Sequence, residues 1–305
     1  MLATALITIN VLSLLAPTEV ILRPAQNARL TVRDSGSQPR QLRFQELVRF
    51  TVGSSSSLSV DSAQPITVEI PGVVKRTYDR AVTLRSIGNR VEVVATVDLE
   101  TAVSWAVRAE SMPLAKPEAL KALGVVARSW YLAAKGRHGN VDACDTTHCQ
   151  FLGSTGAALK EAVATRDLVL LHDGRPLEAM HHANCGGQTK SLADTGMANQ
   201  PYPYYSVKCP APADLWTRTL TNEDAHMLAE NPNSENLRIE ICRRLGWDAI
   251  PGNNYRLAGT KLQGQGRGHG VGLCQEGAAA LAGQGMDYAS ILRHFFPDTR
   301  LAGFR

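Results

Sequence analysis

The sequence predicts an α+β protein: a β-rich N-terminal region, residues 1–97, followed by a mixed helix-and-strand region, residues 98–305, with a groove lined by glycine-rich strands. Short runs of alternating apolar and polar residues, broken by proline and glycine, dominate the first region. Helical periodicity dominates residues 114–136. The later segments show no regular alternation of strand and helix, which favours α+β over βαβ architecture. With 305 residues, 44% of them hydrophobic, the chain can bury the cores of one large or two moderate domains.

The first region is expected to consist of short strands. In segment 4–14, isoleucine and valine alternate with threonine and asparagine, which is strand periodicity. This segment lacks the basic start of a signal peptide, so the signal of an exported protein would lie outside this sequence. No apolar run approaches the ~20 residues of a membrane span. Further strands are expected at residues 19–24, 28–33 and 91–97, with a Gly/Ser break at 53–57.

Helices are expected mainly in the second region. The helix over 114–136 has Pro117 in its first turn and Gly136 as its C-terminal cap. One apolar face of this helix would pack on the core; it is formed by Leu120, Leu123, Ala127, Trp130 and Ala134. The remaining expected elements are a helix at 157–165, a strand at 168–171 that ends at a turn at 173–174, an irregular and helical insertion at 192–250 with a short helix near 223–230, and helices at 276–284 and 287–295.

Cysteine and histidine gather between residues 138 and 150. Cys144, His148 and Cys149 lie within six residues of one another, and His138 precedes them closely. These are the ligand types that zinc prefers, at the short spacings of zinc sites. A Cys144–Cys149 disulfide is the competing interpretation, and the two histidines argue against it as a complete account.

The other cysteines are less informative. Six cysteines in 305 residues do not form a disulfide scaffold, although the even number allows one or two bridges beside a metal. The pairing of the remaining four cannot be read from their spacing. They are Cys185, Cys209, Cys242 and Cys274.

Glycine occupies every second position from Gly264 to Gly272. A dinucleotide-binding motif needs glycines at i, i+2 and i+5, and no register of this segment supplies the third; a Walker loop is also absent. Period-two glycine predicts an extended strand with one bare face, which another segment can approach closely. The opposite face would present Gln265, Arg267 and His269. We expect this strand to form a groove wall rather than a flexible linker.

Segment 181–189 is a second polar, glycine-containing cluster. His181, His182 and Cys185 could bind another metal ion. Adjacent histidines on a strand point to opposite faces, however, so at most one of the two would face a given site. The sequence therefore favours groove lining over metal binding here.

Two charged residues near the predicted core helix are candidate site residues. Glu110 is flanked by apolar and small residues, and such surroundings could keep it protonated as a general acid. The alternative is a surface residue or a helix-dipole partner. Arg128 stands in mid-helix among apolar residues, where it belongs either to a site or to a solvated basic edge. The net charge of +4, without dense basic runs, does not indicate a nucleic-acid-binding protein.

Taken together, five ordered motifs resemble the stage II sporulation protein D (SpoIID) family, which includes the amidase enhancer proteins. The resemblance covers most of the chain and is weakest over residues 190–262. The motifs are Ala109–Pro113, Glu118–Ala122 running to Val126–Ser129, Cys144–Gln150, Cys185–Gly187 and Gly268–Ala278.

This resemblance implies a lytic transglycosylase of the bacterial cell envelope, acting on peptidoglycan strands stripped of stem peptides. Glu110 matches the catalytic acid of the family. The resemblance favours a structural zinc ion at Cys144 and Cys149, with His138 as third ligand and His148 as the alternative. Residues expected to bind sugar hydroxyl or acetamido groups are Arg128, Gln150, His269 and Gln275.

Two alternatives from other functional classes remain open. A non-catalytic wall-binding protein could activate a separate N-acetylmuramoyl-L-alanine amidase, as the amidase-enhancer name suggests, and would need no acid at position 110. A zinc hydrolase would need an open coordination position on its metal ion.

Overall fold

The computed structural model describes residues 5–25, 29–35, 37–43, 45–54, 57–111, 116–152, 156, 158–197 and 200–304. The chain forms two compact units. Unit 1 comprises Met1–Glu110 and Tyr131–Val163, and unit 2 comprises Ser111–Trp130 and Ala164–Arg305. The bounds of these units reflect which residues contact one another. The predicted domain boundary between residues 97 and 98 stays a prediction.

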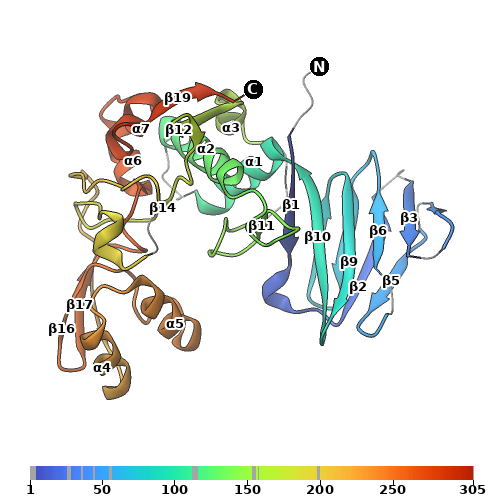
Figure 1. Ribbon diagram of the computed structural model, residues 1–305, viewed down its shortest axis with the longest axis horizontal. Coiled ribbons are helices and arrows are strands. Elements are labelled where there is room, and N and C mark those ends of the chain that lie inside the picture. Colours follow the sequence, from blue (N-terminus) through green and yellow to red (C-terminus); the bar gives the residue numbers. More distant parts are fainter. Residues whose placement is uncertain are drawn as a thin grey trace. The chain divides into compact units, whose positions relative to one another are not determined.

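Unit 1 is built on two sheets, a seven-stranded sheet in the order β11-β1-β10-β9-β6-β3-β4 and a four-stranded sheet in the order β5-β2-β7-β8 (Figure 1). All neighbouring strands are antiparallel except β11, which pairs in parallel with β1. The elements of this unit are β1 (Leu6–Val11), η1 (Ser13–Leu15), β2 (Glu19–Pro24), β3 (Leu30–Asp34), β4 (Arg40–Leu42), β5 (Val48–Thr51), β6 (Leu58–Asp61), β7 (Ile66–Ile70), β8 (Val74–Tyr78), β9 (Ala81–Ile87), β10 (Arg90–Asp98), α1 (Leu99–Glu110) and β11 (Ala143–Cys144).

The strands of unit 1 follow the alternation of the sequence. In β1 the side chains of Ile7, Ile9 and Val11 are buried, while the residues between them are partly exposed. The strands expected at 4–14, 19–24, 28–33 and 91–97 are confirmed as β1, β2, β3 and β10; residues 4 and 28 lie outside the described ranges. The same holds for residues 55–56 of the expected break at 53–57.

Helix α1 was not predicted from the sequence. It begins directly after β10, without an intervening glycine or proline, because the Asp98 carboxylate accepts a hydrogen bond of 2.9 Å from the N–H of Glu100 and caps the helix. Leu99, Ala102 and Ala106 lie on one buried face. The helix contacts β10.

Unit 2 contains three small sheets, β13-β12-β19, β14-β18 and β15-β17-β16, together with most of the helices. Helices α2 and α3 each cross from one unit into the other. Helix α3 (Lys160–Ala164) belongs to unit 1 except for its last residue. The elements of unit 2 are α2 (Pro117–Ala133), β12 (Leu168–His172), β13 (Arg175–Pro176), β14 (His181–His182), η2 (Leu192–Thr195), β15 (Leu215–Thr219), α4 (Asn222–Glu230), α5 (Glu235–Leu245), β16 (Tyr255–Ala258), β17 (Lys261–Gln265), β18 (Leu273–Cys274), α6 (Gln275–Gly283), α7 (Tyr288–Phe295) and β19 (Arg300–Gly303).

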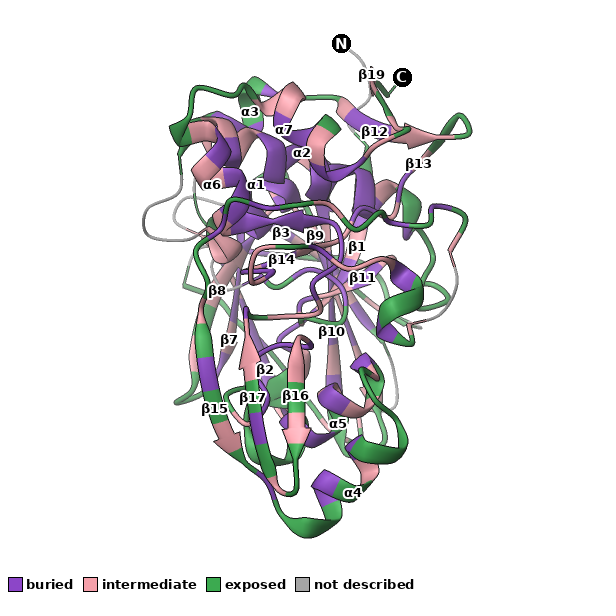
Figure 2. Cartoon of the chain, turned by 90° about the vertical axis from the view of Figure 1, so that its left-hand side faces the viewer, coloured by how far each residue is buried: buried purple, intermediate pink, exposed green. Residues whose placement is uncertain are grey.

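Most expected helices are confirmed. The helix expected over 114–136 is α2; residues 114 and 115 lie outside the described ranges. The helix expected over 157–165 is α3; residue 157 lies outside the described ranges. Helices α4, α6 and α7 match their expected positions, and the expected strand at 168–171 is β12. In Figure 2 α1 and α2 are largely buried, whereas α4 exposes more of its surface. Within the described ranges no helix combines the length and apolar composition needed to span a bilayer.

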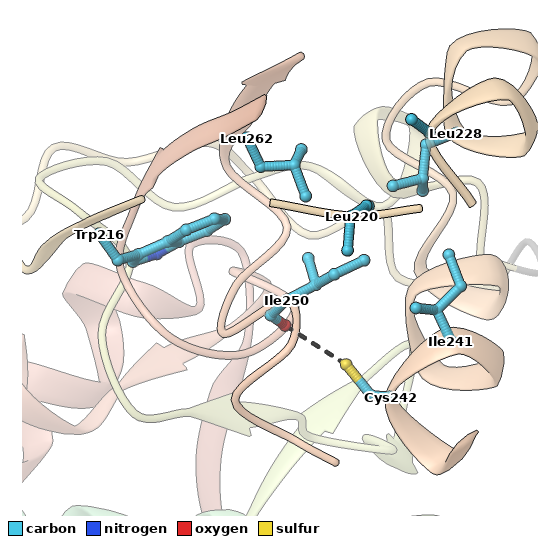
Figure 3. Close-up of a cluster of buried hydrophobic side chains, with 8 residues drawn as sticks. Trp216, Leu220, Leu228, Ile241, Cys242, Ile250 and Leu262 are labelled. Carbon is cyan, nitrogen blue, oxygen red and sulfur yellow. Dashed lines mark hydrogen bonds between the residues drawn. The ribbon is translucent and has the colours of Figure 1, made fainter. Parts of the chain in front are cut away.

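Part of unit 2 has a hydrophobic core of its own, built from β15, β17, α4, α5 and the chain between them (Figure 3). Its buried members are Trp216, Leu220, Ala225, Leu228, Ile241, Cys242, Ile250 and Leu262. The thiol of Cys242 donates a hydrogen bond of 3.5 Å to the carbonyl of Ile250, so Cys242 is an ordinary, satisfied core cysteine. Helix α5 of this core was not predicted.

The glycine-rich segment corrects one prediction. Strand β17 ends at Gln265, and the φ angles of Gly266, Gly268, Gly270 and Gly272 are 77°, 92°, 80° and 74°. The extended strand expected through residue 272 is therefore wrong beyond Gln265, because every second residue adopts a left-handed conformation that favours glycine. The expected close approach is confirmed: a Cβ atom on Gly272 would overlap the carbonyl of Met180.

Candidate functional site

Four potential metal ligands converge in unit 1. The ligand atoms of His138, Cys144, His148 and Cys149 all lie within 4.8 Å of one another. His138 Nε2 is 3.0 Å from Cys149 Sγ, and His148 Nδ1 is 3.5 Å from the same sulfur. Cys144 Sγ is 3.8 Å from His148 Nδ1. The structure thus brings together both histidines that the sequence had offered as alternatives.

The local fold explains this convergence. Strand β11 places Cys144 beside β1, and a turn in which the N–H of Cys149 donates to the carbonyl of Thr146 at 2.9 Å folds the chain back. The N–H of His138 donates to the carbonyl of Val141 at 3.0 Å, which turns the preceding loop toward β11. Residues that are close in the sequence therefore form a cluster through two tight turns.

The electrostatics of the cluster suit a metal ion. Hydrogen bonding from Cys149 lowers the pKa of Cys144 to about 4, with smaller contributions from Thr146 and His148. The hydrogen bond with Cys144, together with burial, raises the pKa of Cys149. One thiol of the pair thus readily becomes a thiolate. Two sulfur and two imidazole donors at this separation fit the tetrahedral donor set of zinc.

Tyr131, which the sequence reasoning missed, is a buried residue of the same unit. Its side chain is 1% exposed. Burial raises the pKa of Tyr131, and the negative charges of Cys149, Cys144, Asp145 and Glu110 raise it further. The hydroxyl group of Tyr131 therefore stays neutral. The sequence signal for Tyr131 was its position four residues after Ala127, which lies on the predicted apolar face of the helix.

Glu110 is the last residue of α1 and is partly exposed. It therefore stands at the C-terminal end of a helix, where it cannot act as a favourable partner of that helix's dipole. The Met112 and Pro113 positions of its sequence motif lie outside the described residues.

Gln150 follows directly after Cys149 and is 3% exposed. Its Oε1 atom is buried without a hydrogen-bond partner among the described residues. A buried acceptor without a partner costs free energy, on the order of 1–3 kcal/mol. The capacity of this atom to accept a hydrogen bond is therefore unused within the described residues.

Three further predicted residues lie in unit 2, and the first of them is Arg128. It is fully buried within α2, so the solvated-edge alternative is excluded. Its guanidinium donates to the carbonyl of Leu168 at 3.0 Å and thereby joins α2 to β12. The binding role assigned to Arg128 from the sequence stays a prediction.

His269 and Gln275 flank β18. His269 Nδ1 accepts a hydrogen bond of 3.0 Å from the N–H of Val271. Burial, helped by the charges of His181 and Arg238, lowers the pKa of His269 to about 3, so its imidazole is neutral. Gln275 is the buried first residue of α6. The binding roles predicted for both residues stay predictions.

Comparison with known proteins shows what the chain resembles. A family model described as "Stage II sporulation protein" (SpoIID) matches residues 88–172. Stage II sporulation protein D of Bacillus amyloliquefaciens is 28% identical over 255 residues, which cover 67% of this chain and 74% of that protein. These matches support assigning the chain to the SpoIID family. An uncharacterised protein of Brachyspira hyodysenteriae is 27% identical over 244 residues, covering 67% of this chain and 66% of that protein.

The SpoIID match includes Glu110, the four residues of the Cys/His cluster, and Gln150. His269 and Gln275 lie beyond its end at residue 172. The chain spans about two thirds to three quarters of the length of the two relatives. The similarity to SpoIID-family proteins supports a role related to the cell wall or to sporulation.

Proposed function

We propose that this chain, which resembles the SpoIID family, is a peptidoglycan lytic transglycosylase. It would cleave the bond between N-acetylmuramic acid and N-acetylglucosamine in denuded glycan strands, leaving 1,6-anhydro ends, in the extracytoplasmic cell envelope. The observation that carries this proposal is that Glu110, at the end of α1, and the Cys/His cluster belong to one compact unit.

In this reaction Glu110 acts twice. As an acid, it protonates the glycosidic oxygen, and the bond from that oxygen to C1 of the muramic acid residue breaks. The resulting carboxylate then takes the proton from the C6 hydroxyl of the same sugar, whose oxygen closes on C1 to form the anhydro ring. An ordinary glycosidase needs two carboxyl groups to manage an external nucleophile. Here the substrate supplies the nucleophile, so one carboxyl group is sufficient.

The position of Glu110 supports this role. The carbonyl groups at the C-terminal end of α1 carry partial negative charge, which favours a protonated carboxyl over a carboxylate. The buried face of α1 holds the end of the helix in a fixed place. Tyr131 stays neutral because burial raises its pKa, and its hydroxyl adds no competing charge.

Zinc fits the cluster of His138, Cys144, His148 and Cys149, and we propose that these residues bind it. Four protein ligands are typical of structural zinc sites, whereas catalytic sites keep a position open. The bound ion would supply a cross-link that holds the loop before Gln150, and it would take no part in bond cleavage. This ligand set disfavours the zinc-hydrolase alternative.

Gln150 is the candidate saccharide contact that the geometry supports best. Its buried, unpartnered Oε1 can accept a hydrogen bond from a sugar hydroxyl or an acetamido N–H. The zinc site would fix the backbone of this residue from the adjacent position 149.

Digestion of denuded glycan strands, followed by mass spectrometry, tests the proposal. The wild-type protein should produce anhydro-muramyl ends, and Glu110→Gln should produce none above background. Glu100→Gln, on the first turn of the same helix, is the matched control and should retain activity.

Three results would count against the proposal. Equal product from wild type and Glu110→Gln would remove the catalytic acid. Reducing ends in place of anhydro ends would indicate hydrolysis. No product from the wild type, with stimulation of a cell-wall amidase, would support the non-catalytic alternative.

A further inference from the structure

A second group of metal-ligand side chains lies in unit 2. The ligand atoms of His182, Cys185 and Cys274 lie within 4.8 Å of one another, and all three residues are buried. None of them belongs to the cluster around Cys144, which lies in the other unit. The proposed reaction uses none of them.

Cys209 brings a third sulfur atom to this group. A Cβ atom placed on Gly277 would overlap the sulfur of Cys209 and lie 3.3 Å from Cβ of Cys274. The absence of a side chain at position 277 therefore makes room for the Cys209 sulfur beside Cys274.

The backbone brings these residues together from distant parts of the sequence. Strands β14 and β18 are parallel neighbours, with His182 in register with Cys274. The N–H of Cys209 donates to the carbonyl of Gly187 at 2.9 Å, which holds Cys209 beside the Cys185–Gly187 turn.

The orientation of His182 points to a ligand. Its side chain is 4% exposed, and Nδ1 lies 3.0 Å from the carbonyl of Val271. Because a carbonyl only accepts, Nδ1 carries the proton and Nε2 presents a lone pair. Nε2 is buried and has no hydrogen-bond partner among the described residues. A metal-binding histidine commonly has its other nitrogen fixed in this way by a carbonyl group.

The sulfur atoms also differ from ordinary core thiols. The N–H of Gly277 donates to Cys274 Sγ at 3.3 Å, at the N-terminal end of α6, where a helix stabilises a thiolate. Cys242 provides the contrast, since its thiol already contacts the carbonyl of Ile250 at 3.5 Å and the guanidinium of Arg238 at 3.9 Å.

We propose that His182, Cys185, Cys209 and Cys274 bind a second, structural zinc ion. Three thiolates and one imidazole form a known tetrahedral donor set for zinc. With Zn–S bonds of about 2.3 Å, sulfur atoms in such a site lie roughly 3.8 Å apart, a separation within the 4.8 Å limit observed for His182, Cys185 and Cys274. The ion would tie β14, the chain at residue 209 and the start of α6 to one another.

The sequence had favoured groove lining for this segment, because adjacent histidines point to opposite faces. That geometric argument holds: His182 belongs to the cluster, whereas His181 does not. The partners that complete the site come from residues 209 and 274, which spacing along the chain could not reveal. The competing arrangement is a disulfide between two of the three thiols, which would leave the third thiol and His182 Nε2 without a ligand.

Zinc content of the full-length protein, measured by native mass spectrometry and by release to a chromophoric chelator, tests this proposal independently of catalysis. The wild type should bind about two zinc ions per chain, and Cys185→Ser/Cys274→Ser about one. Cys144→Ser/Cys149→Ser should lose the other ion. Cys242→Ser, which changes a buried cysteine of the same unit, should retain both.

Cobalt substitution tests the second site in a variant that keeps all four of its proposed ligands. In Cys144→Ser/Cys149→Ser the second site is intact, so bound Co²⁺ should show strong thiolate-to-metal charge-transfer absorption. That absorption should weaken by about one third in the additional Cys209→Ser variant, because one of three thiolates is removed. A single zinc ion in the wild type, lost on Cys144→Ser/Cys149→Ser, would overturn the proposal. So would a disulfide-linked peptide containing two of Cys185, Cys209 and Cys274.

Discussion

The carboxylate of Asp145 accepts a hydrogen bond of 2.6 Å from the main-chain N–H of Leu12, which lies 133 positions earlier in the chain. It also accepts one of 2.7 Å from the hydroxyl of Ser13. Leu12 has a φ angle of 59°, a left-handed conformation that is unfavourable for leucine. Because Asp145 is adjacent to Cys144, one buried carboxylate fixes both a strained turn after β1 and the loop of the candidate zinc site.

Replacing this carboxylate should destabilise unit 1. Asp145→Ala is expected to lower the free energy of unfolding by about 2–4 kcal/mol, because a buried main-chain N–H and a hydroxyl lose their acceptor. Urea denaturation measures the effect. Asp61→Ala removes an exposed ion pair with Arg33 in the same unit and should cost less than about 1 kcal/mol. Equal losses from both variants would show that the Leu12 contact adds no stability.

Both histidines of the first cluster should be zinc ligands. His138→Ala and His148→Ala are each expected to weaken zinc binding roughly tenfold or more, because each ring nitrogen lies within bonding reach of the same cluster. Competition with a chelating dye measures the affinity. His226→Ala, an exposed histidine on α4, is the control. Unchanged affinity in His148→Ala would reduce the site to three ligands and reopen the zinc-hydrolase alternative.

The glycine-rich segment should tolerate no side chain where the backbone of another segment approaches. Gly272→Ala is expected to destabilise the protein by about 2–5 kcal/mol, since it combines a left-handed backbone with a clash against the Met180 carbonyl. Gly259→Ala has a similar φ, 58°, but open space around it, and should cost only about 1–2 kcal/mol. Thermal unfolding compares the two. Similar losses would show that conformation alone requires these glycines.

One ion pair in unit 2 should give a defined pH dependence. Hydrogen bonding from Arg244 holds the pKa of Asp224 below its usual value, with help from Thr221. The pair therefore stabilises the folded state above the unfolded pKa of about 3.9, and this contribution disappears as the pH falls through the lower folded value. The stability difference between wild type and Asp224→Asn should narrow below about pH 4.

Urea midpoints measured across this range check the expected narrowing. Asp248→Asn, which removes an exposed carboxylate paired with Arg218, should show little difference from the wild type at any pH. A constant gap between wild type and Asp224→Asn down to pH 2 would contradict the assignment.

Local signals in the sequence were sufficient for much of the fold. The alternation in β1 and the proline at the start of α2 act over a few residues, and both predictions are confirmed. Helix α1 was missed because Asp98 starts it directly after a strand, without the usual break. Glycine at every second position predicts a strand, but the same pattern is compatible with left-handed residues at alternate positions. Only the close approach of other backbone segments decides between these two conformations.

The site could be predicted only where its residues are neighbours in the sequence. The first Cys/His cluster falls within a dozen residues, so spacing was informative. The grouping of Cys209 with Cys274 depends on tertiary contacts that no local pattern records. The SpoIID resemblance supplied Glu110 as the acid, because a lone glutamate carries no signal of its own.

The core around Trp216 and Ile250 has a consequence for how the chain opens locally. Because its apolar side chains pack on one another, this part of the chain can behave as a cooperative unit that unfolds and refolds while the rest of the protein stays folded.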